Sequence, residues 1–209
     1  MKSLLFDLDG TLINTNELIF KSFIHTFKIF FKDYELSNEE LISFCGPTLE
    51  YTFSRYESDH DMVLKMIDTY AEWNIKHHDE YVTIFANVKE TLDILKTKGY
   101  KMGIVSSKRR PVVLMGLRLF DLEKYFEVIL TAEDVKKHKP DPEIVNKALS
   151  ALDSDDSIII GDNVSDLMAG RNANIKTCGV NWSLKAKDLQ AFKPDYFIYD
   201  MMELLSIVE

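Results

Sequence analysis

Residues 4–11 read Leu-Leu-Phe-Asp-Leu-Asp-Gly-Thr, a short apolar run that passes directly into an acidic turn. A few consecutive apolar residues bounded by turn-forming residues are typical of a buried β-strand. The stretch therefore predicts a strand at the start of the chain, and the carboxylates of Asp7 and Asp9 follow its carboxyl end.

Short apolar runs recur in the second part of the chain, with helical patterns between them. The expected strands are Met102–Val105, Phe126–Leu130, Ser157–Ile160, Thr177–Val180 and Tyr196–Ile198, and the expected helices cover 87–99, 113–120, 142–152 and 165–173. A crossover between parallel strands needs a connection about as long as these helices. The alternation therefore predicts a parallel sheet with helices on both faces.

Residues 15–81 show only helical patterns. Aromatic and aliphatic residues recur at helical spacing from Phe20 to Phe31 and from Met62 to Trp73. The pairs Asn14 with Glu17 and Ser37 with Glu40 resemble capping boxes and predict two helix starts. The predicted fold class is therefore α/β, with a Rossmann-like parallel core made of residues 1–14 and 82–209 and a helical insert at 15–81.

The composition narrows the function classes. The chain has 209 residues, 46% of them hydrophobic, and a formal net charge of -9, which is typical of a compact soluble protein and disfavours binding to nucleic acid or anionic membranes. Cys45 and Cys178 lie far apart, without the spacing of a disulfide framework or a thiolate metal site. No signal peptide or membrane-spanning run is recognised, so we expect a cytoplasmic protein.

Polar side chains collect where the expected strands end. They are Asp7 and Asp9 after the first strand, Ser106 after the next, Lys139 after a third, and Asp162, Asn163 and Asp166 after a fourth. Each has a plainer explanation alone, because acids before glycine form turns and serines cap helices. Ligands of parallel sheets bind at the carboxyl ends of the strands. The shared edge therefore favours one common site.

Clustered carboxylates repel one another unless a cation neutralises them, and hard oxygen ligands suit Mg²⁺. Asp7, Asp9 and Asp162 are the natural metal ligands in this set. A carboxylate beside a metal-held phosphoryl group can attack phosphorus, while Ser106 and Lys139 bind the remaining oxygens. The residues thus predict phosphoryl-transfer chemistry.

These segments, in order, resemble the four motifs of the haloacid dehalogenase-like (HAD) hydrolases: residues 7–12, Ser106, residues 139–142 and residues 161–166. The resemblance implies that the insert at 15–81 is a small helical cap over the α/β catalytic core. It also implies phosphoryl transfer to water, because dehalogenases lack the second acid, here Asp9, and P-type ATPases carry threonine there.

The resemblance further implies a role for each motif residue. Asp7 would be the nucleophile that forms an aspartyl-phosphate, and Asp9 would be the acid and base that also gives its backbone carbonyl to Mg²⁺. Asp162 would be the remaining protein ligand of the metal. Ser106 and Lys139 would bind the phosphoryl group, and Asp166 would orient Lys139 or a metal-bound water, with Asn163 beside it outside the metal ligands.

The substrate expectation is inorganic pyrophosphate. Residues 6–19, Gly46-Pro47 and residues 161–163 resemble bacterial pyrophosphatases of this family. The alternatives are a phosphoglycolate phosphatase-like enzyme, a β-phosphoglucomutase-like phosphotransferase, and a non-catalytic phosphate-binding or interaction module. The basic runs at 108–110 and 136–139 are either a solvated face or a rim that attracts an anionic substrate. The oligomeric state stays open.

Overall fold

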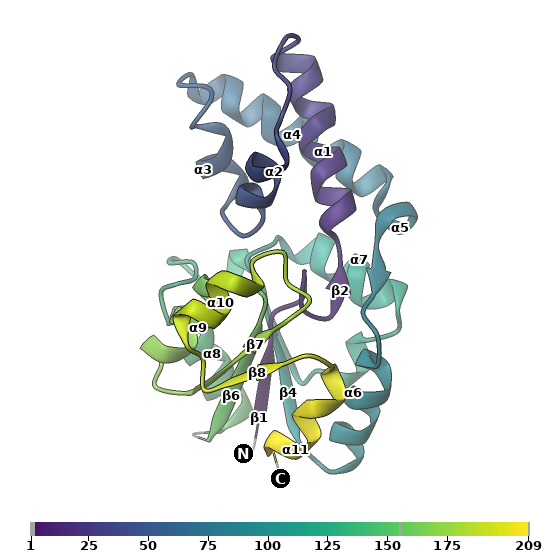
Figure 1. The fold of residues 1–209 in the computed structure, drawn as a ribbon, viewed down its shortest axis with the longest axis vertical. Helices are drawn as coiled ribbons and strands as arrows, with labels where there is room; N and C mark the ends of the chain where they lie inside the picture. Colours follow the sequence, from purple (N-terminus) through teal and green to yellow (C-terminus); the bar gives the residue numbers. More distant parts are fainter. Residues whose placement is uncertain (1–2, 155, 209) are drawn as a thin grey trace. The chain divides into compact units, whose positions relative to one another are not determined.

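The structure is a computed structural model that describes residues 3–154 and 156–208 (Figure 1). The chain divides into two compact units. One is the helical unit, residues 15–82, and the other is the core unit, made of the segments before and after it. Their predicted roles as cap and catalytic core stay predictions.

A six-stranded parallel sheet forms the centre of the core unit. Its strands are β1 (Ser3–Phe6), β4 (Lys101–Val105), β5 (Val128–Leu130), β6 (Ser157–Gly161), β7 (Lys176–Val180) and β8 (Tyr196–Ile198), in the order β5-β4-β1-β6-β7-β8. The predicted α/β class and parallel sheet are confirmed. The strand expected from Phe126 starts two residues later, because Phe126 ends the 3₁₀ turn at 123–125.

Helices cover both faces of the sheet. Leu5, Val105 and Ile159 form one apolar cluster with α8 (Glu143–Leu152) and α9 (Val164–Asn172). On the other side lie α6 (Val88–Thr97) and α11 (Leu204–Val208), which contact each other (Figure 1). Two further helices, α7 (Arg110–Leu119) and α10 (Ala186–Phe192), complete the core unit among the described residues.

The position of β1 decides where a site can form. Phe6 pairs with Ile104 of β4 on one side and with Ile160 of β6 on the other. In the sheet, the chain runs from β1 to β4 and β5 on one side, and later continues with β6 on the other side of β1. The carboxyl end of β1 is therefore a topological switch point, the usual ligand position in such sheets. Residues that follow β1, β4 and β6 come together at this edge.

A second ladder was not predicted. β2 (Ile13–Asn14) pairs antiparallel with β3 (Thr83–Ile84), on either side of the helical unit in sequence. This pairing also explains why the capping box expected at Asn14 is wrong. Asn14 belongs to β2, so the N-cap of α1 is Thr15, whose side chain makes no capping hydrogen bond.

The helical unit contains α1 (Asn16–Phe30), α2 (Asn38–Phe44), α3 (Leu49–Phe53), α4 (His60–Lys76) and α5 (His78–Tyr81). Its core is aromatic: the ring of Phe23 lies 4.7 Å from the rings of Phe44 and Tyr70, centre to centre. Aromatic rings bury large apolar areas, so a unit of this size can form its own core. The capping box predicted at Ser37 and Glu40 is confirmed.

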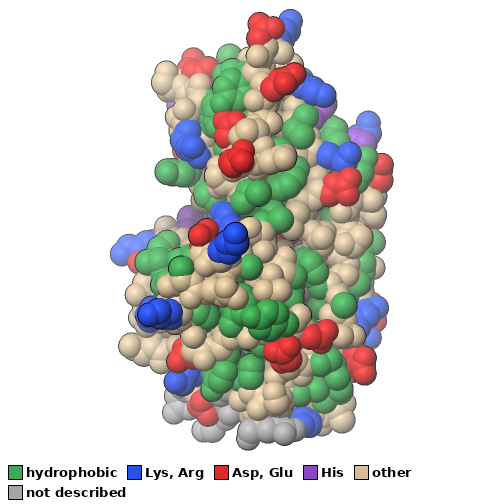
Figure 2. All heavy atoms as spheres, viewed as in Figure 1, with side chains coloured by type: hydrophobic (Ala, Val, Ile, Leu, Met, Phe, Trp, Pro, Cys, Tyr) green, Lys and Arg blue, Asp and Glu red, His purple; other side chains and the backbone are tan. Residues whose placement is uncertain are grey.

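Surface features agree with the composition. On the face drawn in Figure 2, acidic and basic side chains are interspersed with apolar ones over the described residues. None of the helices in the described ranges combines the length and the apolar character that crossing a bilayer would need.

Candidate active site

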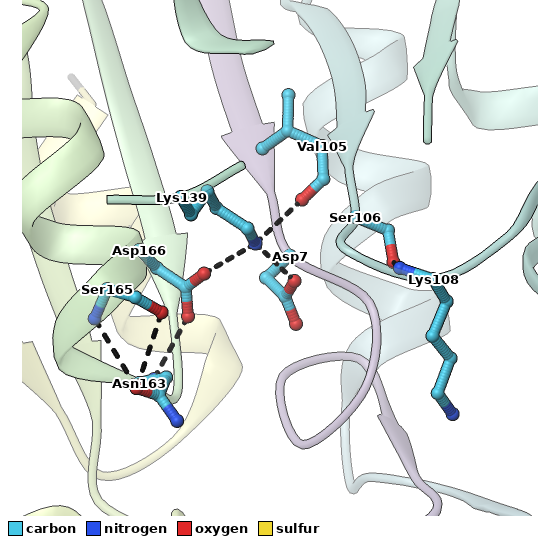
Figure 3. Close-up of polar contacts among 8 residues, drawn as sticks. All are labelled: Asp7, Val105, Ser106, Lys108, Lys139, Asn163, Ser165 and Asp166. Atoms are coloured by element: carbon cyan, nitrogen blue, oxygen red, sulfur yellow. Dashed lines mark hydrogen bonds and ion pairs between the residues drawn. The ribbon is translucent and has the colours of Figure 1, made fainter. Parts of the chain in front are cut away.

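Four acidic or basic side chains from separate segments meet at the carboxyl edge of the core sheet. Asp7 follows β1, Lys139 lies in the loop between β5 and α8, Asp162 follows β6, and Asp166 stands in the first turn of α9. Figure 3 shows Lys139 between Asp166 and Asp7, with Ser106 on the opposite side of Asp7. The structure thus brings these predicted residues together.

Lys139 is the centre of this arrangement. Its Nζ lies 2.7 Å from Oδ1 of Asp7 and 3.0 Å from the carbonyl oxygen of Val105, and it also donates to Oδ1 of Asp166. These three acceptors match the three hydrogens of an ammonium group. The side chain is only 3% exposed. Burial opposes its charge, but the carboxylates of Asp166 and Asp7 outweigh burial and raise the pKa of Lys139.

The acids around Lys139 carry more negative charge than one ammonium neutralises. Burial raises the pKa of Asp7 to about 7, with further increases from Asp166 and Asp9 and an opposing effect from Lys139. Burial, followed by the charges of Asp7 and Asp166, raises the pKa of Asp162 well above its ordinary value. A bound cation would lower the pKa values of Asp7 and Asp162 again, because it favours the ionised carboxylates.

The donor set fits a hard divalent cation. Asp7, Asp162 and Asp166 each offer a carboxylate oxygen, and these oxygens lie within 4.8 Å of one another. All are oxygen donors, the type that Mg²⁺ and Ca²⁺ take in proteins. The carboxylate of Asp9 is not part of this group, and its expected contribution is its backbone carbonyl.

Two glycines allow the acids to approach so closely. Gly10 has a φ of +80°, and a Cβ there would lie 2.2 Å from Oδ2 of Asp162. A Cβ on Gly161 would lie 2.4 Å from the Cβ of Asp166. Any side chain at either position would displace a carboxylate of the site. The glycines of these two motifs are therefore required by space, and Gly10 also by its backbone conformation.

Asn163 positions Asp166 through the start of α9. The side chain of Asn163 accepts from the backbone N–H of Ser165, and the backbone N–H of Asn163 donates to Oδ2 of Asp166 at 3.0 Å. This is a capping box. One oxygen of Asp166 is thereby held by the helix start, and the other faces Lys139.

Ser106 and Asp9 share a partner, Lys108, which belongs to the basic run at 108–110 that the sequence offered as a possible rim of the site. The buried Oγ of Ser106 accepts from the backbone N–H of Lys108 at 3.2 Å, and Nζ of Lys108 lies 2.7 Å from Oδ1 of Asp9. Lys137, in the other basic run, is 74% exposed beside Asp141. Within the ranges that the structure describes, Lys108 and Lys139 are the members of these runs that bond the acids of the site.

Two more contacts brace the acidic loops. The indole N–H of Trp182 donates to the carbonyl of Thr11 at 3.2 Å, and Oγ of Ser183 donates to the carbonyl of Asp162 at 2.6 Å. Both residues follow β7. No pattern in the sequence links them to motifs so far away in the chain.

Comparisons with known proteins agree with this geometry. Residues 4–180 match the family model described as haloacid dehalogenase-like hydrolase. A pyrophosphatase PpaX of Bacillus cereus strain Q1 is 44% identical over 211 residues, which cover all of this chain and 96% of that protein.

Solved structures show the same fold. A haloacid dehalogenase-like family hydrolase from Streptococcus pneumoniae superposes with a TM-score of 0.88 at 22% identity, over 100% of this chain and 99% of that one. A predicted phosphatase from Clostridium acetobutylicum gives 0.86 at 26% identity, over 99% and 97%. On the family match and the full-length identity, this chain belongs to the haloacid dehalogenase-like hydrolase family.

Proposed function

We propose that the protein is a Mg²⁺-dependent phosphohydrolase that hydrolyses inorganic pyrophosphate through an aspartyl-phosphate on Asp7. The observation that carries the chemistry is the buried Asp7 carboxylate, held by Lys139 next to Asp162 and Asp166. The choice of substrate rests on the full-length similarity to pyrophosphatase PpaX.

In the first step, a carboxylate oxygen of Asp7 attacks phosphorus. A new P–O bond forms to Asp7, and the bond between phosphorus and the leaving oxygen breaks. Asp9 gives a proton to that leaving oxygen, so the first phosphate departs. Lys139 and Ser106 hold oxygens of the transferred group. In the free protein, Nζ of Lys139 lies 2.7 Å from Oδ1 of the attacking Asp7.

In the second step, Asp9 accepts a proton from a water molecule, whose oxygen attacks the phosphorus on Asp7. The P–O bond to Asp7 breaks and the second phosphate leaves, which restores both carboxyl groups. The side chain of Asp9 is 16% exposed, so water reaches it in the free protein.

The residues that would hold Mg²⁺ are Asp7 and Asp162 through carboxylate oxygens and Asp9 through its backbone carbonyl. When bound, the ion offsets the negative charge of phosphoryl oxygens near the nucleophile. Asp166 lies within the same group of oxygens, but its bonds to Lys139 and to the N–H of Asn163 support a role in orienting the lysine.

A substrate panel with Mg²⁺ tests this function. Phosphate release should give the highest kcat/KM for pyrophosphate, ahead of phosphoglycolate and β-glucose 1-phosphate. Excess chelator should abolish turnover, and full activity in chelator contradicts the metal site. Phosphoglycolate turned over about tenfold more efficiently, a difference of about 1.4 kcal/mol, contradicts the substrate. Conversion of β-glucose 1-phosphate to an isomer without phosphate release would indicate a phosphotransferase.

A further inference from the structure

Lys108 is fixed in a definite place by its backbone. Its N–H donates to Oγ of Ser106 at 3.2 Å, and its carbonyl accepts from the N–H of Ala132 at 2.9 Å. The side chain leaves the turn after β4 on the Ser106 side of Asp7 (Figure 3). Its ammonium lies 2.7 Å from Oδ1 of Asp9, and the side chain as a whole is 27% exposed.

The two lysines of the site serve different acids. Lys139 is buried, and in the free protein its three hydrogens go to Asp7, Asp166 and a backbone carbonyl. One of these bonds must be exchanged when Lys139 holds an oxygen of the transferred group. Lys108 donates to Asp9, and this bond uses one of its three hydrogens. Its remaining hydrogens can reach a ligand without breaking the contact with Asp9, because part of the side chain is open to solvent.

The partner of Lys108 indicates which part of a substrate it meets. In the proposed reaction, Asp9 protonates the leaving oxygen, so that oxygen lies within hydrogen-bond distance of the Asp9 carboxylate. Nζ of Lys108 lies next to the same carboxylate. Lys108 is therefore beside the leaving group, whereas Lys139 is beside the nucleophile.

This placement discriminates between substrate classes by charge. The leaving group of a diphosphate is itself a phosphate and carries negative oxygens, while an alcohol leaving group is neutral. A lysine ammonium binds phosphate oxygens as a point charge, and charge-assisted bonds are about twice as strong as neutral ones. We propose that Lys108 is a specificity-determining residue that binds the leaving phosphate and selects P–O–P substrates over esters with uncharged leaving groups. This inference rests on the proposed function.

The test compares two substrates in two variants. Pyrophosphate and glycerol 2-phosphate both need a proton from Asp9 on the leaving oxygen, so they differ mainly in the charge beside that oxygen. Lys108→Met should lower kcat/KM for pyrophosphate about tenfold or more relative to glycerol 2-phosphate, the size of one hydrogen bond to a charged group. Lys108→Arg should recover part of this selectivity. The matched control is Lys124→Met, which removes an exposed lysine paired with Asp121 at 2.6 Å and should leave both substrates unchanged.

Two outcomes overturn the proposal. If Lys108→Met slows both substrates equally, the lysine only positions Asp9. If it slows neither, it has no role in the reaction. Circular dichroism of the variant excludes a folding defect as the cause of a general loss.

A binding measurement keeps this proposal separate from the proposed substrate. In the Asp7→Asn background, calorimetry with Mg²⁺ measures the affinity for pyrophosphate and for orthophosphate. Lys108→Met should weaken pyrophosphate about tenfold and orthophosphate little, because only the former has a second phosphate near Asp9. If the wild type does not hydrolyse pyrophosphate, the proposed substrate is wrong. Equal weakening of both ligands, or of neither, then still refutes the role of Lys108.

Discussion

The ammonium nitrogen of Lys139 lies 2.7 Å from Oδ1 of Asp7 and donates at the same time to Asp166. One buried positive charge is thus shared by two carboxylates, and a third, that of Asp162, lies beside them. Burial and mutual repulsion raise the pKa values of Asp7 and Asp162, although Lys139 lowers both. The charge of Lys139 thus offsets only part of the cost of ionising these acids in the metal-free protein. Lys139 therefore contributes to stability as well as to chemistry.

Lys139→Met should lower the stability of the metal-free protein. Removing one partner of a buried ion pair typically costs about 3–5 kcal/mol, and protonation of the acids would offset part of that cost. Added Mg²⁺ should raise Tm more in Lys139→Met than in the wild type, because the ion replaces the missing positive charge. Thermal unfolding with and without Mg²⁺ measures both effects, with Lys124→Met as the control. A variant that gains no more from Mg²⁺ than the wild type contradicts this account.

Asp7→Asn should reduce turnover by several orders of magnitude, because the amide keeps the shape but cannot attack phosphorus. Mass spectrometry of quenched wild-type enzyme should find phosphate on the peptide containing Asp7, and none in the variant. Burial raises the pKa of Asp7 to about 7, so above that pH its charge destabilises the metal-free fold. Asp7→Asn should then unfold at no lower temperature than the wild type at about pH 8, which separates loss of the nucleophile from loss of structure.

An element of the fold could be predicted from the sequence where a continuous stretch of residues shows its pattern. The apolar run of β1 and the acids after it lie in one continuous stretch, so strand and site follow from the same residues. The ladder between β2 and β3 has two residues on each side, too short for an alternating pattern. The sequence also could not show that this ladder moves the start of α1. Asparagine favours the N-cap position, but Asn14 pairs with β3 through its backbone, so α1 begins after Thr15 instead.

In the candidate site, too, some contacts could be predicted from the sequence and others could not. Asp7, Lys139 and Asp162 could be placed together because parallel strands put their carboxyl ends at one edge. The contact of Lys108 with Asp9 spans 99 positions in sequence, and that of Trp182 with Thr11 spans 171. Such pairs depend on how loops fold after their strands end, and neither periodicity nor a motif records this.

Asp9→Asn should lower kcat/KM for pyrophosphate about 10²–10⁴-fold, the usual contribution of a general acid or base. The amide keeps the backbone carbonyl and can still accept from Lys108. With p-nitrophenyl phosphate, whose leaving group needs little protonation, the first step should survive while attack by water slows. Stopped-flow measurements should therefore show a burst of about one equivalent of nitrophenolate per enzyme. Unchanged steady-state turnover of pyrophosphate would remove Asp9 from the mechanism.

Gly10→Ala should weaken the metal site. The new Cβ would lie 2.2 Å from Oδ2 of Asp162, so this carboxylate must move. Gly99→Ala is a matched control, because Gly99 has nearly the same φ, +81°, with no atom within 4 Å of the added Cβ. Both variants should lose about 1–2 kcal/mol through backbone strain. Only Gly10→Ala should need more Mg²⁺ for half-maximal activity, and an equal Mg²⁺ requirement in both variants refutes the contact as the cause.

The carboxylate of Glu40, in the helical unit, accepts hydrogen bonds from two tyrosine hydroxyls and one backbone N–H. Its Oε1 accepts from Tyr34 and from Tyr56, the latter at 2.8 Å, and its Oε2 accepts from the N–H of Ser37 at 2.9 Å. The Tyr34 hydroxyl, then the Ser37 N–H and the Tyr56 hydroxyl, lower the pKa of Glu40 to about 2. Glu39 precedes it in the same helix and is exposed.

Because the folded protein binds the proton of Glu40 more weakly than the unfolded chain does, the ionised carboxylate stabilises the fold above the unfolded pKa of about 4.3. This stabilisation is lost as the pH falls toward about 2. Glu40→Gln should therefore lower stability near neutral pH by about 1 kcal/mol, because the hydrogen bonds are partly exposed. That corresponds to about 2–4 °C in Tm for a chain of this length. The deficit should shrink between about pH 4 and pH 2, where the wild-type Glu40 also becomes neutral.

Glu39→Gln is the control, because it removes the same charge without these hydrogen bonds and should shift Tm less. Thermal unfolding followed by circular dichroism across this pH range provides the comparison, and a deficit that stays constant down to about pH 2 would show that the charge of Glu40 is not its source.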